Sequence, residues 1–322
     1  MTEETRVKLV SPKELAQKLG PGFVLGNTVL VEVDWTGQVT TNYFALRDDR
    51  GLRARNEATI KYCEALFRRF GDLRYLEEQS AKSGSFVFQG GDTPHDLRSV
   101  GWQRKHTYEH VCLVPDFYYV NGWKTYKRNA SLKWEDKISK ALWRGSTTGS
   151  LQNQLSTIRN LPRYKLCKIG KKLGAQADFA FTNIVQEKNE NEKEAIRHLF
   201  IQEDILTGRL PFDEYEKYKL IVQIDGNGNN WELFRKLLLG SCLLLVDSDW
   251  QLWHNRNIQR WEHYVPIKND LTDLEAMIDW CFRHEHEAEK IGFRGRQYAL
   301  SVDFASEMDF AAKLVFDHLL GE

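Results

Sequence analysis

The chain has 322 residues, enough for two domains of ordinary size, and its 42% hydrophobic and 28% charged residues are typical of a globular protein rather than a disordered one. Its 45 basic and 45 acidic residues give a formal net charge of zero, so we expect no nucleic-acid partner. The five cysteines are widely spaced and form no CxxC pair, which argues against a disulfide framework and against a structural zinc site.

Neither the N-terminus nor the apolar runs indicate export or membrane insertion. Residues 1–10 are charged and lack the apolar stretch of a secretory signal. No run of about 18 apolar residues occurs, so no membrane-spanning helix is expected. Together with the cysteine spacing, this favours a reducing, cytoplasmic compartment.

The first part of the chain mixes short helices and strands. Ser11 before Pro12 predicts the start of a helix that ends at Gly20. The further elements predicted here are a hairpin of residues 29–33 and 40–46, a helix at 56–70, and short strands at 86–88 and 111–114.

The texture changes near Ser131, after which strands and helices alternate. This alternation predicts a parallel sheet with helices on both faces. Strands are expected at 141–143, 178–181, 220–224, 242–246 and 263–267, helices at 150–159, 231–239 and 271–282, and a largely helical tail at 284–320. The polar run at 186–193 is interpreted as a mobile loop.

The first candidate site follows the predicted strand at 141–143. Its residues are Arg144, Gly145, Ser146, Thr147, Thr148 and Gly149. In open α/β sheets ligands bind at the carboxyl ends of the strands. Glycine lets the backbone approach a phosphate, a helix N-terminus favours an anion, and arginine can donate two bonds to phosphate oxygens. An anion site is one interpretation, and a capped helix start with an incidental arginine is the other.

A second loop of the same kind follows the strand at 220–224. Its residues are Asp225, Gly226, Asn227, Gly228, Asn229 and Asn230, with Arg235 and Lys236 one to two turns into the next predicted helix. Two such loops in one sheet are expected to converge at the carboxyl edge. A turn followed by a helix cap is the alternative.

Two acidic motifs have weaker signals. Asp247-Ser248-Asp249 could hold a divalent metal on a diphosphate, but the neighbouring Trp250 and Trp253 favour a helix cap. The loop after the strand at 86–88 contains Asp92 and His95, either of which could act as a general base. The alternative for Asp92 is an Asx-turn before Thr93-Pro94.

The order and spacing of four motifs resemble glycosyltransferase family 90. They lie between residues 84 and 319: the run 142–149; Tyr218-Lys219 with Asp225-Gly226-Asn227; the run 234–238 with Gly240-Ser241; and the run 261–267. The first eighty residues match the family only loosely. No cysteine pairs of the secreted relatives are present, as in a bacterial type of member.

The resemblance implies an α/β fold of GT-B type, with two Rossmann-like domains facing across a cleft. The domains expected are residues 1–132 on the acceptor side, with a C-terminal helix at about 305–322 packing back on it, and 133–304 on the donor side. The resemblance also implies a UDP-sugar donor, inversion at the anomeric carbon and no bound metal.

The resemblance gives roles to particular residues. Asp92 falls on the family's general base, which would take the proton of the acceptor hydroxyl. Arg144, Ser146 and Thr148, with the backbone of 225–230, would stabilise the diphosphate leaving group. The chain departs from the family at 230–234, where a phosphate-binding arginine is missing, and Arg235 is the candidate replacement.

We therefore expect an inverting transferase that moves a hexose from a UDP-sugar to a hydroxyl of a glycan or glycolipid, such as lipopolysaccharide core or capsule. The donor is a substrate and no cofactor is expected. Such an acceptor predicts peripheral contact with the inner membrane. The main alternative is a non-catalytic nucleotide- or glycan-binding module on a decayed transferase fold. A metal-dependent transferase using Asp247-Ser248-Asp249 is another. A dehydrogenase is disfavoured because no GxGxxG is present.

Overall fold

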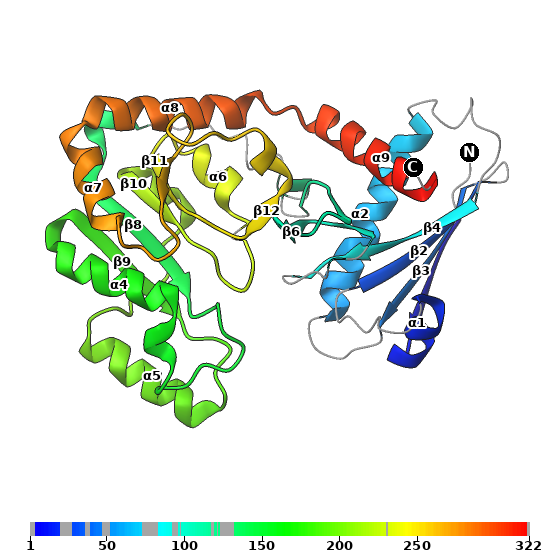
Figure 1. The fold of residues 1–322 in the computed structure, drawn as a ribbon, viewed down its shortest axis with the longest axis horizontal. Helices are drawn as coiled ribbons and strands as arrows, with labels where there is room; N and C mark the ends of the chain where they lie inside the picture. Colours follow the sequence, from blue (N-terminus) through cyan, green and yellow to red (C-terminus); the bar gives the residue numbers. More distant parts are fainter. Residues whose placement is uncertain are drawn as a thin grey trace. The chain divides into compact units, whose positions relative to one another are not determined.

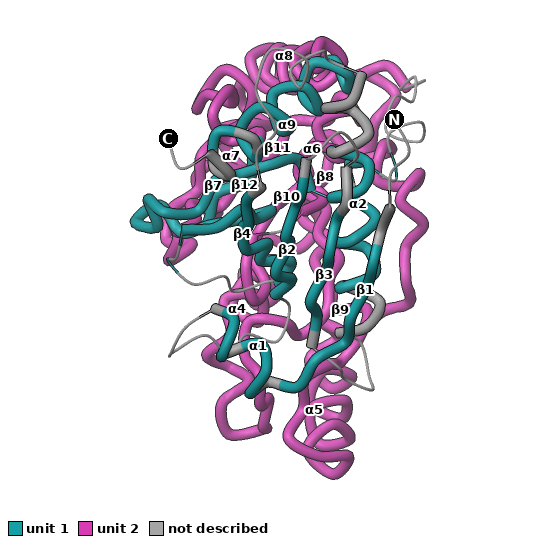
Figure 2. Tube along the Cα trace, turned by 90° about the vertical axis from the view of Figure 1, so that its right-hand side faces the viewer, with its two compact units in different colours: residues 1–123, 250–253, 303–322 teal, residues 124–249, 254–302 magenta. Residues whose placement is uncertain are grey.

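The computed structural model describes residues 4–19, 28–35, 39–46, 52–72, 83–91, 96, 98–116, 119–120, 122, 132–229 and 231–320. Two compact units make up the chain. Unit 1 comprises Met1–Trp123, Trp250–Trp253 and Asp303–Glu322, and unit 2 comprises Lys124–Asp249 and His254–Val302 (Figure 2).

Unit 1 is built on a mixed six-stranded sheet with the order β1-β3-β2-β4-β5-β7, of which Figure 1 labels β2, β3 and β4. The strands are β1 (Glu4–Val10), β2 (Thr28–Trp35), β3 (Val39–Leu46), β4 (Ser83–Gln89), β5 (Ser99–Gly101) and β7 (Val111–Leu113). β2 and β3 pair antiparallel, which confirms the hairpin expected from the alternating residues. A separate two-stranded ribbon pairs β6 (Gln103–Lys105) with β12 (Trp250–Leu252).

Helices cover both faces of this sheet. α1 (Pro12–Leu19) begins with the predicted cap at Ser11, whose backbone N–H donates to Glu14 at 2.7 Å. Leu15 of α1 joins an apolar cluster with Leu30, Phe44 and Val87. Successive side chains of a strand point to opposite faces. The other face is covered by α2 (Leu52–Asp72), where Tyr62 meets the ring of Phe88 edge-on at 5.6 Å.

The end of the chain belongs to unit 1. α9 (Phe304–Leu320) packs against α2 and β4. The short segment that contains β12 is also fixed in this unit, because Trp253 Nε1 donates to Asp116 Oδ2 at 3.0 Å. Its ring packs against Tyr119 with centroids 4.6 Å apart.

Unit 2 contains a parallel five-stranded sheet with the order β13-β11-β10-β8-β9. Its strands are β8 (Ile138–Ser146), β9 (Ala177–Asn183), β10 (Tyr218–Gln223), β11 (Cys242–Val246) and β13 (Val265–Ile267). The chain leaves β8 for β9 on one side and then crosses to β10 on the other. The carboxyl ends of β8 and β10 therefore form a topological switch point, where open α/β sheets bind ligands.

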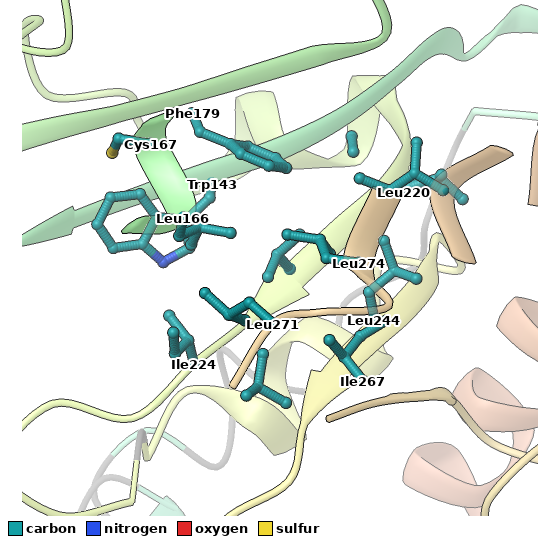
Figure 3. Packing of buried hydrophobic residues seen from close by; sticks show 14 of the residues in the cluster. Trp143, Leu166, Cys167, Phe179, Leu220, Ile224, Leu244, Ile267, Leu271 and Leu274 are labelled. Atoms are coloured by element: carbon teal, nitrogen blue, oxygen red, sulfur yellow. The ribbon is translucent and has the colours of Figure 1, made fainter. Parts of the chain in front are cut away.

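The helices of unit 2 are α4 (Pro162–Leu173), α5 (Glu190–Gln202), α6 (Leu233–Leu237), α7 (Leu274–Arg283) and α8 (Glu285–Ser301). The strand β11 and the central runs 141–143 of β8 and 220–222 of β10 are continuously apolar, because both faces of the sheet are buried there. Figure 3 shows Leu166 of α4 and Leu274 of α7 in the same cluster as Leu220 and Leu244 of the sheet. This α/β architecture with a Rossmann-like parallel sheet confirms the predicted fold class.

The predicted helix at 150–159 is wrong. Residues 150–157 form turns and a bridge between Asn153 and Glu187, and the α-helix begins only at Pro162. The Asn153 side chain donates to the carbonyl oxygens of Thr147 and Val185, both at 2.8 Å. Such side-chain bonds compete with helix formation.

Two other boundaries differ from the prediction. The loop expected at 186–193 runs into α5, whose start is capped by Asn189 Oδ1 accepting from the backbone of Glu192 at 3.0 Å. Glu190 and Glu192 of that run lie in the first turn of α5, whose buried residues are Ile196 and Phe200. The helix expected at 231–239 has only the five residues of α6.

All five cysteines are free thiols: Cys63, Cys112, Cys167, Cys242 and Cys281. Within the described ranges, no helix has both the length and the apolarity needed to cross a bilayer.

Candidate functional site

The loops after β8 and β10 lie side by side, joined by one buried arginine. Arg163, in the first turn of α4, is only 7% exposed. Its Nη1 donates to Ser146 O at 3.0 Å and Thr148 Oγ1 at 2.5 Å, and its Nε donates to Asp225 O at 2.7 Å. The predicted convergence of the two loops is therefore correct. Because Arg163 is buried, its pKa is lowered to about 10.

Close backbone packing reinforces this junction. The N–H of Gly149, which has a φ of +119°, donates to Asn227 Oδ1 at 2.9 Å. At Gly226 an added Cβ would lie 2.5 Å from Thr148 Oγ1, so only glycine fits between the loops. The loop pair is consequently a rigid, filled structure.

A cavity of about 750 Å³ opens beside this junction, at the carboxyl ends of β8 and β9. Its wall combines the end of β8, the end of β9, the segment before β10 and the side of α6. The lining residues are Arg144, Gly145, Ser146, Thr182, Asn183, Arg209, Leu210, Pro211, Phe212, Tyr215, Glu232 and Arg235. Three arginines against one glutamate give the cavity wall an excess of positively charged side chains.

The segment before β10 reaches the cavity because it first extends the sheet beside β9. The N–H of Phe181 donates to Ile205 O, and the N–H of Thr207 donates to Phe181 O, both at 2.8 Å. Residue 208 thus starts near the carboxyl end of the sheet, and the following residues line the cavity on the way back to Tyr218.

Arg144 is held by its own sheet. Its Nη2 donates to Asp178 Oδ1 at 2.7 Å, and its Nη1 donates to the carbonyl oxygens of Trp143 at 2.9 Å and Asp178 at 2.6 Å. Asp178 also accepts from the hydroxyl of Tyr218 at 3.2 Å. Three of the five guanidinium donors are used in this way, and the charge is neutralised by a carboxylate.

The guanidinium of Arg235 packs on a pair of stacked aromatic rings. Its guanidinium lies over the ring of Phe212, 3.5 Å from the centroid. Phe212 in turn stacks on Tyr215, with ring centroids 5.3 Å apart and an interplanar angle of 23°. Burial raises the pKa of Tyr215 to about 12, and Glu232 adds to the rise. Three nearby guanidinium groups oppose that rise: Arg144, Arg209 and Arg235.

A buried lysine, Lys236, lies next to the cavity residue Glu232. Lys236 is 2% exposed, and its Nζ donates to Gln223 Oε1 at 2.7 Å and lies 3.8 Å from Glu232 Oε2. Burial lowers the pKa of Lys236 to about 8, against the opposing effect of Glu232. The negative charge of Glu232 is therefore matched locally.

The Asp247-Ser248-Asp249 motif is engaged in internal contacts. Asp247 Oδ1 accepts from Arg260 Nη2 at 2.8 Å, and the hydroxyl of Ser248 donates to Asp225. The expected helix cap is wrong, because strand β12 follows instead of a helix. Among the residues that the structure describes, no group of three His, Cys, Asp or Glu side chains could hold a metal ion.

The structure brings most of the predicted residues together. Arg144, Gly145, Ser146 and Arg235 line the cavity. The adjoining loop pair holds Thr148, Asp225, Gly226, Asn227, Gly228 and Asn229. Asp92, the predicted base, and Asn230 lie outside the described residues.

Several cavity residues were missed by sequence reasoning, namely Arg209, Phe212, Tyr215 and Glu232. The signal that could have located the first two is the Gly208-Arg209-Leu210-Pro211-Phe212 run, a glycine- and proline-containing loop just before a buried strand. Its place at the carboxyl edge follows from pairing with β9, which no local pattern predicts.

The chain is similar to known proteins over its second half and beyond. The sequence model of glycosyl transferase family 90 matches residues 121–316, more than half of the chain. Uncharacterized protein 035R of Invertebrate iridescent virus 3 is 30% identical over 184 residues, covering 55% of this chain and 16% of the viral protein. Protein O-glucosyltransferase 2 of Danio rerio is 29% identical over 166 residues, covering 52% of this chain and 29% of the fish protein.

The chain thus spans less than a third of the length of these two relatives.

Among solved structures, Anabaena HepE in complex with UDP-glucose is similar with 8% identity and a TM-score of 0.40, over 63% of this chain and 52% of that chain. So weak a likeness decides nothing about the site.

Proposed function

The chain belongs to glycosyl transferase family 90, and from this premise we propose that it transfers a sugar from a UDP-sugar to a hydroxyl group of a glycan acceptor. The observation that carries the proposal is the cavity of unit 2. It lies within the family-matched segment, at the strand ends where α/β sheets bind ligands, and it is lined by three arginines. A nucleoside diphosphate is an anion of suitable charge for such a wall.

The proposed reaction is a single displacement with inversion. The acceptor oxygen attacks the anomeric carbon as the bond from that carbon to the diphosphate oxygen breaks, and UDP leaves with the bonding electrons. Asp92 is the proposed base that takes the acceptor proton, a role that rests on the family resemblance. Positive side chains and the backbone at the strand ends would stabilise the charge that develops on the leaving group.

The predicted anion site has a place in this proposal. Gly145 and Ser146 line the cavity at the end of β8, where the nucleotide would approach the backbone. The adjoining loops after β8 and β10 are held together through Thr148, Asp225 and Asn227, and they would fix the position of this strand end. Metal independence is part of the proposal and is supported by the internal contacts of Asp247 and Ser248.

The sugar and acceptor are proposed more coarsely. A hexose fits the name of the fish relative, a protein O-glucosyltransferase. A lipopolysaccharide-core or capsule acceptor, a cytoplasmic location and peripheral contact with the inner membrane rest on the resemblance to bacterial family members.

A non-catalytic nucleotide-binding module is the second candidate. The ion pair of Arg144 with Asp178 favours it, because a charge already matched by a carboxylate stabilises a leaving group less. This module would bind UDP without transferring or hydrolysing the sugar.

The test is a thermal-shift and hydrolysis screen with UDP-, GDP-, CMP- and dTDP-sugars, with and without EDTA. The proposal predicts stabilisation by UDP and one UDP-sugar, with slow hydrolysis that EDTA does not inhibit. Binding without hydrolysis or transfer would favour the module, and no stabilisation by any nucleotide would refute both candidates.

The role of Asp92 is tested by Asp92→Asn, with Asp96→Asn as the matched control. Asp96 is exposed, and its carboxylate accepts a hydrogen bond from the backbone N–H of His110. The first variant should lose transfer by about 100-fold or more while still binding UDP, and the control should keep both. Undiminished transfer in Asp92→Asn would remove it from the role.

A further inference from the structure

We propose that Arg209 and Arg235 hold the diphosphate of the donor nucleotide, and that Phe212 is a positioning residue that orients Arg235 for this contact. The inference rests on the proposed function and adds to it two residues, Arg209 and Phe212, that no sequence motif indicated. It also makes Arg144 an organiser of the cavity rather than the main phosphate ligand.

Arg144 has few donors left for a ligand. Three of its hydrogen bonds go to Asp178 and to the backbone, and its side chain is only 10% exposed. Its Nε is buried and has no hydrogen-bond partner among the described residues. A phosphate oxygen would therefore have to displace a carboxylate to gain the fork of two parallel bonds that arginine forms best.

Arg235 has the opposite character. Within the described part of the chain it forms no ion pair with a carboxylate, and its guanidinium rests on the face of Phe212 at 3.5 Å. An aromatic face attracts the cation but uses none of its N–H donors, which lie in the guanidinium plane. The whole donor set of Arg235 thus stays available at the cavity wall.

Phe212 is itself fixed. Its ring stacks on Tyr215, which is 7% exposed and belongs to the same 3₁₀ turn, Phe212–Lys217. Tyr215, Phe212 and Arg235 are therefore stacked in that order, with the buried Tyr215 at one end and the guanidinium of Arg235 at the other. Such a stack reduces the freedom that a long arginine side chain would otherwise lose on binding.

The charges of the cavity match a sugar-linked diphosphate. Asp178 neutralises Arg144, and Lys236 lies 3.8 Å from Glu232. Arg209 is exposed and, like Arg235, has no carboxylate partner in the described ranges. Two unmatched positive charges remain, and a diphosphate that is esterified at both ends carries two negative ones.

The experiment measures UDP affinity by calorimetry for the full chain and for Arg209→Gln, Arg235→Gln, Phe212→Ala and Phe212→Trp. Arg197→Gln is the matched control, since Arg197 pairs with Glu194 on α5 and is not part of the cavity wall. Thermal unfolding without ligand identifies any variant that fails to fold.

Arg209→Gln and Arg235→Gln should each bind UDP about 10- to 100-fold more weakly, the loss expected for a charge-assisted contact. The dependence of affinity on salt should also become shallower in both, which a purely structural role would not cause. Phe212→Ala should lower the affinity for UDP by about 3- to 10-fold. Phe212→Trp should keep most of the affinity, because tryptophan also binds a cation on the face of its ring. The Arg197→Gln control should match the wild type.

Two results would overturn the inference. If the wild type binds UDP and folded Arg209→Gln and Arg235→Gln bind it equally well, the assignment is wrong while the proposed function stands. If the wild type binds no UDP, the proposed function itself fails, and the inference fails with it.

Discussion

Two arginines of unit 2, Arg163 and Arg235, are held in opposite ways. Arg163 is buried at the loop junction and gives its donors to four protein oxygens, those of Ser146, Thr148, Ile224 and Asp225. Arg235 lies at a cavity wall and rests on an aromatic ring that accepts none of its N–H bonds. The difference teaches that an arginine near a strand end is scaffold when its donors are used internally and ligand-directed when they are not.

The largest expected effect is at Arg163. Replacing this buried cation with leucine removes the donor from one buried and three partly buried oxygens, so the free energy of unfolding should fall by about 3–5 kcal/mol. Urea unfolding followed by circular dichroism measures it. Arg163→Lys should recover only part of the loss, because an ammonium cannot reproduce the planar fork. A loss below about 1 kcal/mol for leucine would break the comparison.

Lys236 extends the comparison to a buried cation that can lose its proton. Its pKa is lowered from the ordinary 10.5 to about 8 by burial. Between these two pH values the unfolded chain binds more protons than the folded one, so the free energy of unfolding gains a contribution that rises with pH. The full rise is at most about 3 kcal/mol.

Comparing the wild type with Lys236→Met separates the contribution of Lys236 to the free energy of unfolding from the contributions of the other titratable residues. The stability difference between the two proteins should change in favour of the wild type from pH 8 to 10.5. Stability profiles that stay parallel across that window would show that Lys236 keeps an ordinary pKa.

Gly226 tests the closeness of the two loops. An alanine there would place its Cβ 2.5 Å from Thr148 Oγ1 and 3.0 Å from Arg163 Nη2, so about 1–3 kcal/mol of stability should be lost. The double variant Gly226→Ala/Thr148→Ala should recover about 0.5 kcal/mol or more relative to additivity. Strict additivity would mean that the two residues are not in contact.

The smallest effect is expected at Asp178, the partner of Arg144. Its side chain is 34% exposed, so Asp178→Asn should cost only about 1 kcal/mol after allowance for solvent screening. Asp204→Asn is the control, because Asp204 is 89% exposed in its pair with Lys171 and should change stability by less than about 0.5 kcal/mol. Equal losses in the two variants would contradict an organising role for the Arg144 pair.

The sequence predicted the parallel sheet and the edge at which the site lies. Apolar runs such as 141–143 and 220–224 mark buried strands, and each is followed by a polar loop that contains glycine. The carboxyl ends of parallel strands meet at one edge, so Arg144, Asp225 and Arg235 could be placed near one another without coordinates.

The rest depended on contacts that are distant in sequence. The helix predicted at 150–159 fails because Asn153 bonds to Val185, 32 residues away. The roles of the arginines also depend on partners that lie far away in the sequence, because Asp178 pairs with Arg144 and the ring of Phe212 lies under Arg235. Local periodicity carries no information about which carboxylate or ring a given arginine meets.

The most direct test of the central claim is hydrogen exchange of the backbone amides with and without UDP, read by mass spectrometry. The account predicts that UDP slows exchange in three segments of unit 2, at residues 144–149, 208–215 and 231–236, with little change in α5 or α8. Protection confined to unit 1, or none at saturating UDP, would contradict a nucleotide site at the carboxyl ends of β8 and β9.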